Sequence, residues 1–168
     1  MADIRASVQA AVQYLSEHPA EARYTDSEAT ATLEDGLRFR VGGPTTEEVF
    51  TDMPAAVGGN DSAPSPGWLL RAAVASCVGT LVAMEAARAG LQLSLLDVRV
   101  DSESDDRGIL GMDPSMPAGP LSMRIVVHIA APETDATTLE QVARRGVDRC
   151  PVADAVQRAV ETTVLIGT

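Results

Sequence analysis

The sequence holds two thiols, Cys77 and Cys150, which lie 73 positions apart and are the residues best suited to do chemistry. Thiolates act as nucleophiles, as metal ligands and as disulfide partners. A zinc site is difficult to assemble, because the chain has only two histidines and no Cys-x-x-Cys motif. The chain also lacks lysine, which excludes Schiff-base and P-loop chemistry. We therefore expect no metal and no cofactor, and the thiols are either a functional pair or two inert, buried groups.

The charge balance limits the classes of molecule that the protein is expected to bind. Thirteen basic residues, all of them arginine, stand against 24 acidic ones and give a formal net charge of −11. A surface of this sign repels phosphate backbones and anionic lipids, so we expect neither a nucleic acid nor a membrane as partner. No stretch approaches the roughly 20 uncharged apolar residues of a membrane span. Charges interrupt the apolar residues at the N-terminus, which is unlike a secretion signal, and we expect a cytoplasmic protein of one domain.

A long helix is predicted to carry Cys77 in its middle. Ser65 and Pro66 are typical of an N-cap followed by the first helical position, and Gly90 is typical of a C-cap. The residues between them are apolar almost all round the helix. Such a helix is predicted to be buried on every side, and in a small domain it also favours a homodimer.

The remaining elements are predicted from hydrophobic periodicity and turn residues. Alternating residues predict that Leu96, Val98 and Val100 share one face of a strand and that Met123, Ile125, Val127 and Ile129 face inward from another. The sequence predicts an α+β fold with helices packed against antiparallel sheets. The predicted elements are a helix at 4–18, a hairpin at 28–41 turning at Asp35-Gly36, strands at 47–52, 93–101, 121–131 and 161–166, an irregular connection at 102–119, a helix at 137–149 that Cys150-Pro151 interrupts, and a helical turn at 154–159.

Five stretches follow one another along the chain in this order: GLRFRV, GGNDSAPSP, LLRAAVASC, DVRVDSESDDRGILG and RCPVADAV. Through them, residues 28–168 resemble the osmotically inducible protein C and organic hydroperoxide resistance (OsmC/Ohr) superfamily, and residues 1–27 form a helix and linker outside the resemblance. The resemblance implies an OsmC-like fold in an intertwined homodimer. It also implies a thiol peroxidase that takes a small hydroperoxide and a dithiol reductant. By matching position, Cys77 is the peroxidatic thiol and Cys150 resolves it.

Such a role requires a cation beside Cys77. A free thiol has a pKa of about 8.5 and is mostly protonated at neutral pH. Cys77 lies eleven positions after Pro66, beyond the reach of the helix dipole, and an apolar helix raises a thiol's pKa. Without lysine, the cation must be arginine or protonated histidine. The resemblance implies an arginine from an early strand, for which Arg38 and Arg40 are the candidates.

The resemblance also implies a glutamate at the start of the Cys77 helix that orients this arginine. The matching positions hold Gly67 and Trp68, so the carboxylate is absent unless a loop supplies Asp61, Glu47 or Glu48.

Trp68 itself could wall an apolar substrate pocket or plug the core or a dimer interface. Three hypotheses follow for the chain. They are a peroxidase of organic hydroperoxides, a catalytically weak or inactive dimer that binds a small apolar ligand, and a structural dimer with inert thiols.

Overall fold

The computed structural model describes residues 3–167 and shows an α+β protein with antiparallel sheets. The chain forms two compact units. One comprises Gln9–Ala72, and the other comprises the residues up to Val8 together with those from Ala73 onward. The elements are α1 (Ile4–Glu17), β1 (Thr30–Asp35), β2 (Arg38–Gly42), β3 (Glu48–Thr51), α2 (Pro66–Arg88), β4 (Leu95–Glu103), α3 (Asp106–Ile109), β5 (Ser122–Ala130), α4 (Ala136–Asp148) and α5 (Pro151–Gln157), with short 3-10 helices at Pro19–Ala22 and Ala55–Val57.

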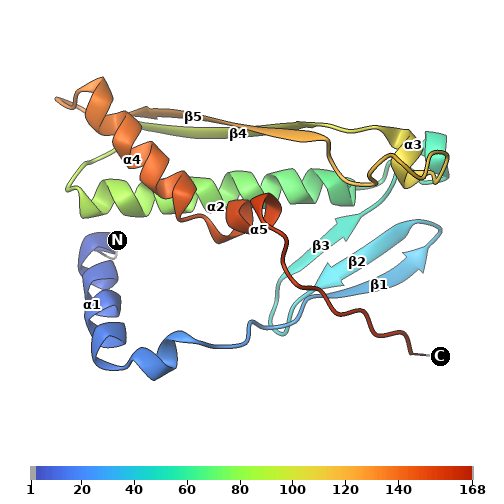
Figure 1. Ribbon diagram of the computed structural model, residues 1–168, viewed down its shortest axis with the longest axis horizontal. Coiled ribbons are helices and arrows are strands. Elements are labelled where there is room, and N and C mark those ends of the chain that lie inside the picture. Colours follow the sequence, from blue (N-terminus) through green and yellow to red (C-terminus); the bar gives the residue numbers. More distant parts are fainter. Residues whose placement is uncertain (1–2, 168) are drawn as a thin grey trace. The chain divides into compact units, whose positions relative to one another are not determined.

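The unit of residues 9–72 contains a three-stranded antiparallel sheet in the order β1-β2-β3 (Figure 1). The predicted hairpin is confirmed, and Gly36 provides the positive φ of 55° that its turn requires. The register of β1 on β2 shifts between Leu33 and Asp35. This irregularity lies at Glu34, next to the turn.

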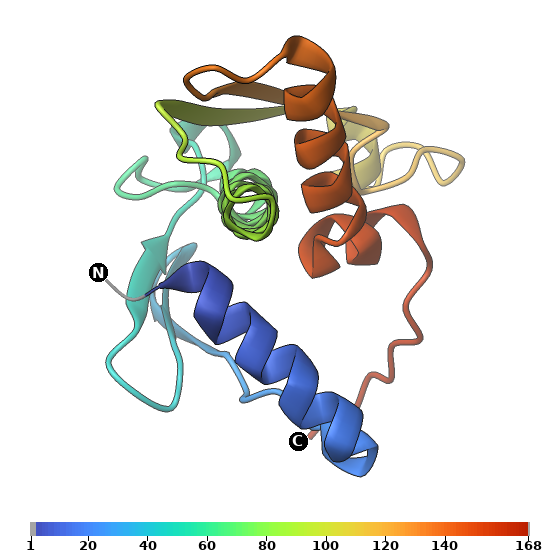
Figure 2. The ribbon, with the colours of Figure 1, turned by 90° about the vertical axis from the view of Figure 1, so that its left-hand side faces the viewer.

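The unit that begins at Ala73 is built around α2. The β4–β5 ribbon runs along this helix, and α4 crosses beside it, as the end-on view of α2 in Figure 2 shows. The inward faces predicted for the two strands are confirmed, because all seven of those side chains pack against the buried cluster of the unit. That cluster consists of Val74, Val78, Val82, Ala86, Val142, Cys150 and Ala153.

The helix α2 begins and ends where the sequence predicts. The Ser65 hydroxyl accepts a hydrogen bond from the Trp68 amide at 3.2 Å, and Gly90 has a φ of 75° just after the last turn. Burial on every side is wrong for the single chain, because only one stripe of valines and alanine is fully buried. The opposite side carries small and polar residues such as Ser76 and Thr80, which need no apolar cover.

By length and composition, α2 could also cross a membrane, and it is the one such helix in residues 3–167. Its buried valines and its buried Glu85 are instead features of a core helix.

A glycine sets the distance between α4 and α2. A Cβ built on Gly146 would lie 2.7 Å from both the amide nitrogen and the Cα of Val82 and 2.6 Å from its Cγ2. Real Cβ contacts are not this short, so only a residue without a side chain allows this approach. The contact lies one turn before Cys150 and brings the end of α4 onto α2.

Two segments differ from the sequence prediction. Within the connection at 102–119, residues 106–109 form the short helix α3, because the Asp105 carboxylate caps it at the Arg107 amide, 3.0 Å away, and also binds the Arg107 guanidinium. The strand predicted at 161–166 does not form. Its backbone has no partner strand, and a single strand cannot satisfy its own amides and carbonyls.

Candidate functional site

The structure brings the two thiols together. Cys77 lies in the middle of α2 and is half-buried, whereas Cys150 lies between α4 and α5 and is fully buried. Both are free thiols, and Cys77 packs against the buried cluster that contains Cys150. Residues far apart in the sequence therefore meet in one apolar cluster, with the more accessible sulfur on α2 and the enclosed one on the facing segment.

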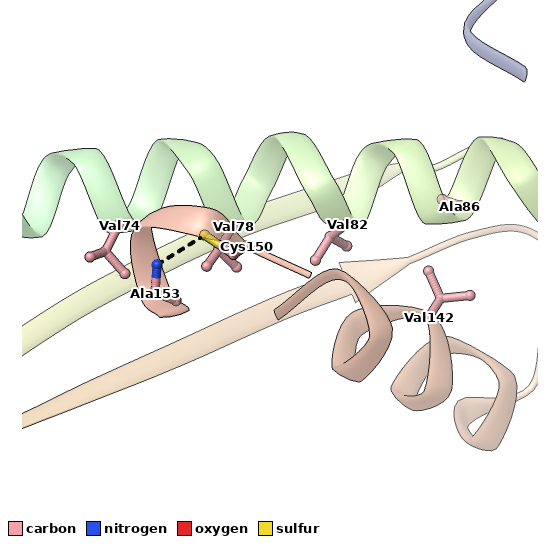
Figure 3. Close-up of a cluster of buried hydrophobic side chains, with 7 residues drawn as sticks. All are labelled: Val74, Val78, Val82, Ala86, Val142, Cys150 and Ala153. Carbon is pink, nitrogen blue, oxygen red and sulfur yellow. Dashed lines mark hydrogen bonds between the residues drawn. The ribbon is translucent and has the colours of Figure 1, made fainter. Parts of the chain in front are cut away.

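The position of Cys150 follows from the break between α4 and α5. Pro151 is the first residue of α5, and it cannot continue α4 because it has no amide hydrogen to donate. Cys150 therefore adopts an extended conformation and acts as the N-cap of α5. Its Sγ accepts a hydrogen bond from the Ala153 amide at 3.4 Å and lies beside the valines of α2 (Figure 3).

The electrostatics of the pair are asymmetric. Burial raises the pKa of the Cys150 thiol, the hydrogen bond from the Ala153 amide offsets part of this increase, and the neighbouring Cys77 side chain raises the pKa further. A raised pKa keeps Cys150 protonated at neutral pH, so it is a poor nucleophile in the resting protein. The difference in burial leaves Cys77 as the thiol that a small molecule can reach first.

The two candidate arginines lie on β2, in the unit of residues 9–72. The Arg38 guanidinium binds Glu34 at 3.2 Å, donates to the Ser62 hydroxyl at 2.8 Å and stacks over the Phe50 ring with 4.4 Å to its centroid. Arg40 is more exposed and makes only long ion pairs of 3.7 Å with Glu34 and Glu48. Arg38 is therefore the arginine that is held in a defined orientation.

The carboxylates proposed from the loops have other roles. Glu48 pairs with Arg40, Glu47 accepts a hydrogen bond from Thr45, and Asp61 accepts one from the Ala55 amide at 3.1 Å. The carboxylate that binds Arg38 is Glu34, which the sequence reading missed. A signal was available, because the hairpin register that pairs Leu33 with Phe39 brings Glu34 opposite Arg38 when it is continued by one residue.

A second missed carboxylate, Asp52, organises the loop that presents Ser62 to Arg38. Asp52 is buried, and its oxygens accept from the amides of Met53, Asn60 and Ser62 and from the Ser62 hydroxyl. These hydrogen bonds, led by that of the Ser62 hydroxyl, lower the pKa of Asp52 to about 2. The stabilisation from the ionised carboxylate is present above its ordinary pKa and is lost as the pH falls toward 2.

Trp68 is half-exposed in the first turn of α2 and lines a pocket of about 410 Å³. The other lining residues include Asp52, Asp61, Ser65 and Arg71. This wall is more polar than the apolar pocket expected from the sequence, and the substrate role of Trp68 stays a prediction. Within residues 3–167, no cluster of three or more His, Cys, Asp or Glu residues could hold a metal ion.

Comparisons with known proteins agree with this architecture. The family described as OsmC-like protein matches residues 58–165. The chain is similar to the crystal structure of an OsmC-like protein from Mycoplasma pneumoniae, with a TM-score of 0.68 and 15% identity over 82% of this chain and 91% of that one. It is similar to an organic hydroperoxide resistance protein OsmC from Legionella pneumophila, described as a predicted redox protein, with a TM-score of 0.59 and 16% identity over 80% and 91% of the two chains.

A third similar structure is a putative osmotic stress induced and detoxification response protein from Psychrobacter arcticus, with a TM-score of 0.56 and 22% identity over 79% of this chain and 90% of that one. At these identities the structural similarity establishes the fold. A search of curated proteins finds no match. Since the family match covers more than half of the chain, the protein belongs to the OsmC-like family.

Proposed function

We propose that this protein is a thiol peroxidase that reduces organic hydroperoxides, with Cys77 as the attacking thiol and Cys150 as the resolving thiol. The observation that carries the proposal is the placement of a more accessible and an enclosed thiol at one apolar cluster. Membership of the OsmC-like family supports it, as does the similarity to a Legionella protein named for organic hydroperoxide resistance.

The chemistry balances with these two sulfurs and one external reductant. The Cys77 thiolate attacks the distal oxygen of the hydroperoxide, the O–O bond breaks, and the alkoxide leaves and takes up a proton to become the alcohol. Cys77 is thereby oxidised to a sulfenic acid. The Cys150 thiol then loses its proton and attacks the Cys77 sulfur, and hydroxide leaves as water. A dithiol reductant exchanges with the resulting disulfide and returns both thiols.

The surroundings of the pair favour apolar peroxides. The residues of the cluster that holds the thiols are valines, leucines, isoleucines, alanines and one methionine, which offer no strong hydrogen bonds to the second hydroxyl of hydrogen peroxide. The exposed apolar side chains of Ile4, Val12 and Leu15 on α1 need cover and support a homodimer, as the sequence predicts. Two free thiols also fit a reducing compartment, for which we propose the cytoplasm.

The test of the proposal is the fate of the thiols. Treating the reduced protein with one equivalent of an alkyl hydroperoxide should yield the alcohol and one intramolecular Cys77–Cys150 disulfide. Peptide mass spectrometry after alkylation checks this, because the disulfide protects both residues from the reagent. Two alkylated cysteines after the treatment, or two separate sulfinic acids, would contradict the proposal. Hydrogen peroxide at the same concentration is the matched comparison, and we expect it to form the disulfide more slowly than the alkyl hydroperoxide does.

We further propose that an arginine of β2 supplies the cation for the Cys77 thiolate. Because Arg38 is held in a defined orientation and Arg40 is not, we expect the larger effect at Arg38. Replacing Arg38 with glutamine should lower the rate at pH 7 by about tenfold or more, since the variant lacks the positive charge that we propose stabilises the Cys77 anion. At pH 9 the thiol ionises unaided and the defect should shrink. Arg40→Gln is the matched control, and equal pH–rate profiles for both variants and wild type would refute the assignment.

A further inference from the structure

The helix that carries Cys77 also carries a buried carboxylate that the proposed chemistry does not use. Glu85 is only 5% exposed, two turns beyond Cys77 on α2. A buried carboxylate is costly unless it is paired. Glu85 is bound by three guanidinium groups, those of Arg88 at 3.0 Å, Arg145 at 3.5 Å and Arg149 at a shorter distance.

The three arginines differ in where they attach. Arg88 lies one turn away from Glu85 on α2 itself, so its contact stays within one helix. Arg145 and Arg149 belong to the last turn of α4 and its C-cap. Their contacts with Glu85 therefore join the end of α4 to α2, the helix that carries Cys77.

Arg149 is the residue immediately before Cys150. Its backbone amide completes the end of α4 by donating to the Arg145 carbonyl at 3.2 Å, and its side chain reaches back to Glu85. Beyond it, the chain leaves α4 at Cys150 and enters α5 at Pro151. The Glu85–Arg149 ion pair is thus the side-chain anchor nearest in sequence to the resolving thiol.

We propose that Glu85, acting through Arg149, is the positioning residue that holds Cys150 within reach of Cys77. This inference deepens the proposed function and rests on its pairing of the two thiols. A disulfide forms only when the two Cα atoms lie within about 7 Å with suitable geometry. A loose junction between α4 and α5 would satisfy that condition for only part of the time, and the ion pair removes this freedom.

The measured quantity is the effective concentration of the two thiols toward each other. It is obtained by equilibrating the protein with reduced and oxidised glutathione, quenching with acid and quantifying the Cys77–Cys150 disulfide by mass spectrometry. The measurement gives the equilibrium constant for forming the Cys77–Cys150 disulfide with glutathione. Arg149→Gln should lower this equilibrium constant by about tenfold, which corresponds to the loss of one hydrogen bond to a charged group. Glu85→Gln should lower it to a similar extent, and Arg149→Lys, which keeps the charge, should recover most of the loss.

The matched control is Arg88→Gln, which removes the same charge from the same carboxylate but leaves the link between the helices intact. It should keep the equilibrium constant within about twofold of wild type. Equal losses in Arg88→Gln and Arg149→Gln would overturn the inference, because the effect would then be one of local charge. Wild-type behaviour of Arg149→Gln would overturn it as well.

Two further measurements separate the possible failures. Thermal unfolding of the reduced variants identifies a general loss of structure. If Arg149→Gln shows such a loss, the disulfide equilibrium constant of Arg149→Lys, compared with that of wild type, decides whether the charge at position 149 positions Cys150. The glutathione equilibrium needs no hydroperoxide, so its result is independent of peroxidase activity. A wild-type protein that consumes no hydroperoxide refutes the proposed function, whereas the positioning role of Glu85 is judged by the equilibrium alone.

Discussion

Replacing Cys77 with serine should reduce the consumption of alkyl hydroperoxides to the background rate. A serine hydroxyl has no accessible anion at neutral pH and cannot be oxidised to a sulfenic acid, so both the nucleophile and the electron donor are lost. The measurement is hydroperoxide loss in the presence of a dithiol, compared with buffer and with wild type. If wild type and Cys77→Ser consume the peroxide equally at background rate, the chain is not a peroxidase. It is then a dimer that binds a small apolar ligand, or a structural dimer with inert thiols.

Cys150→Ser is the control that separates the two thiols. This variant keeps the attacking sulfur but has no thiol to form the disulfide, so it should complete a single turnover. Excess hydroperoxide should then carry Cys77 from the sulfenic to the sulfinic acid, a mass gain that is not reversed by dithiols. Sustained turnover by Cys150→Ser at the wild-type rate would show that an external thiol, and not Cys150, resolves Cys77.

The second large effect is expected at Gly146. Replacement with alanine would place a Cβ 2.7 Å from the backbone of Val82, so α4 must move away from α2. Overpacking of this kind costs about 1–3 kcal/mol of unfolding free energy. Because Cys150 follows α4 after a single residue, the same shift should lower the glutathione equilibrium constant of the disulfide. Urea unfolding of the reduced protein measures the first effect.

The matched control for this change is Gly79→Ala on α2. A Cβ at Gly79 would meet the Val98 side chain at 3.8 Å, an ordinary contact. Alanine is the better helix former by roughly 0.5–1 kcal/mol, so this variant should be as stable as wild type or more stable. A Gly146→Ala protein that also gains stability would show that the helices do not approach as closely as the structure indicates.

Local sequence signals predicted much of this fold. Ser65 and Pro66 begin α2, Asp35-Gly36 turns the hairpin, and Pro151 separates α4 from α5. Each signal acts over a few neighbouring residues, through a cap, a turn or a missing amide hydrogen. The match of Cys77 with Cys150 came from the family resemblance, and their meeting at one buried cluster depends on packing that no local pattern contains.

The residues that the sequence reading missed depend on tertiary structure. Glu34 binds Arg38 across the hairpin, and this pair depends on the register of β1 on β2, which alternation within one strand does not contain. Asp52 gathers donors from a loop that is irregular in sequence. In the sequence, Glu85 is one of the few charges on an apolar helix. Its role could not be predicted, because its partners on α4 lie some 60 positions further along the chain. The strand predicted at 161–166 fails for the same reason, since a strand needs a partner.

The contact at Gly146 also restricts how this protein can change over evolutionary time. The clash that a side chain would cause involves the amide nitrogen and Cα of Val82, atoms that every amino acid possesses. No substitution at position 82 can therefore make room for a larger residue at position 146. A lineage that loses this glycine can recover only by moving one helix, which would separate the two cysteines. For as long as the thiols must meet, this position has a single permitted residue.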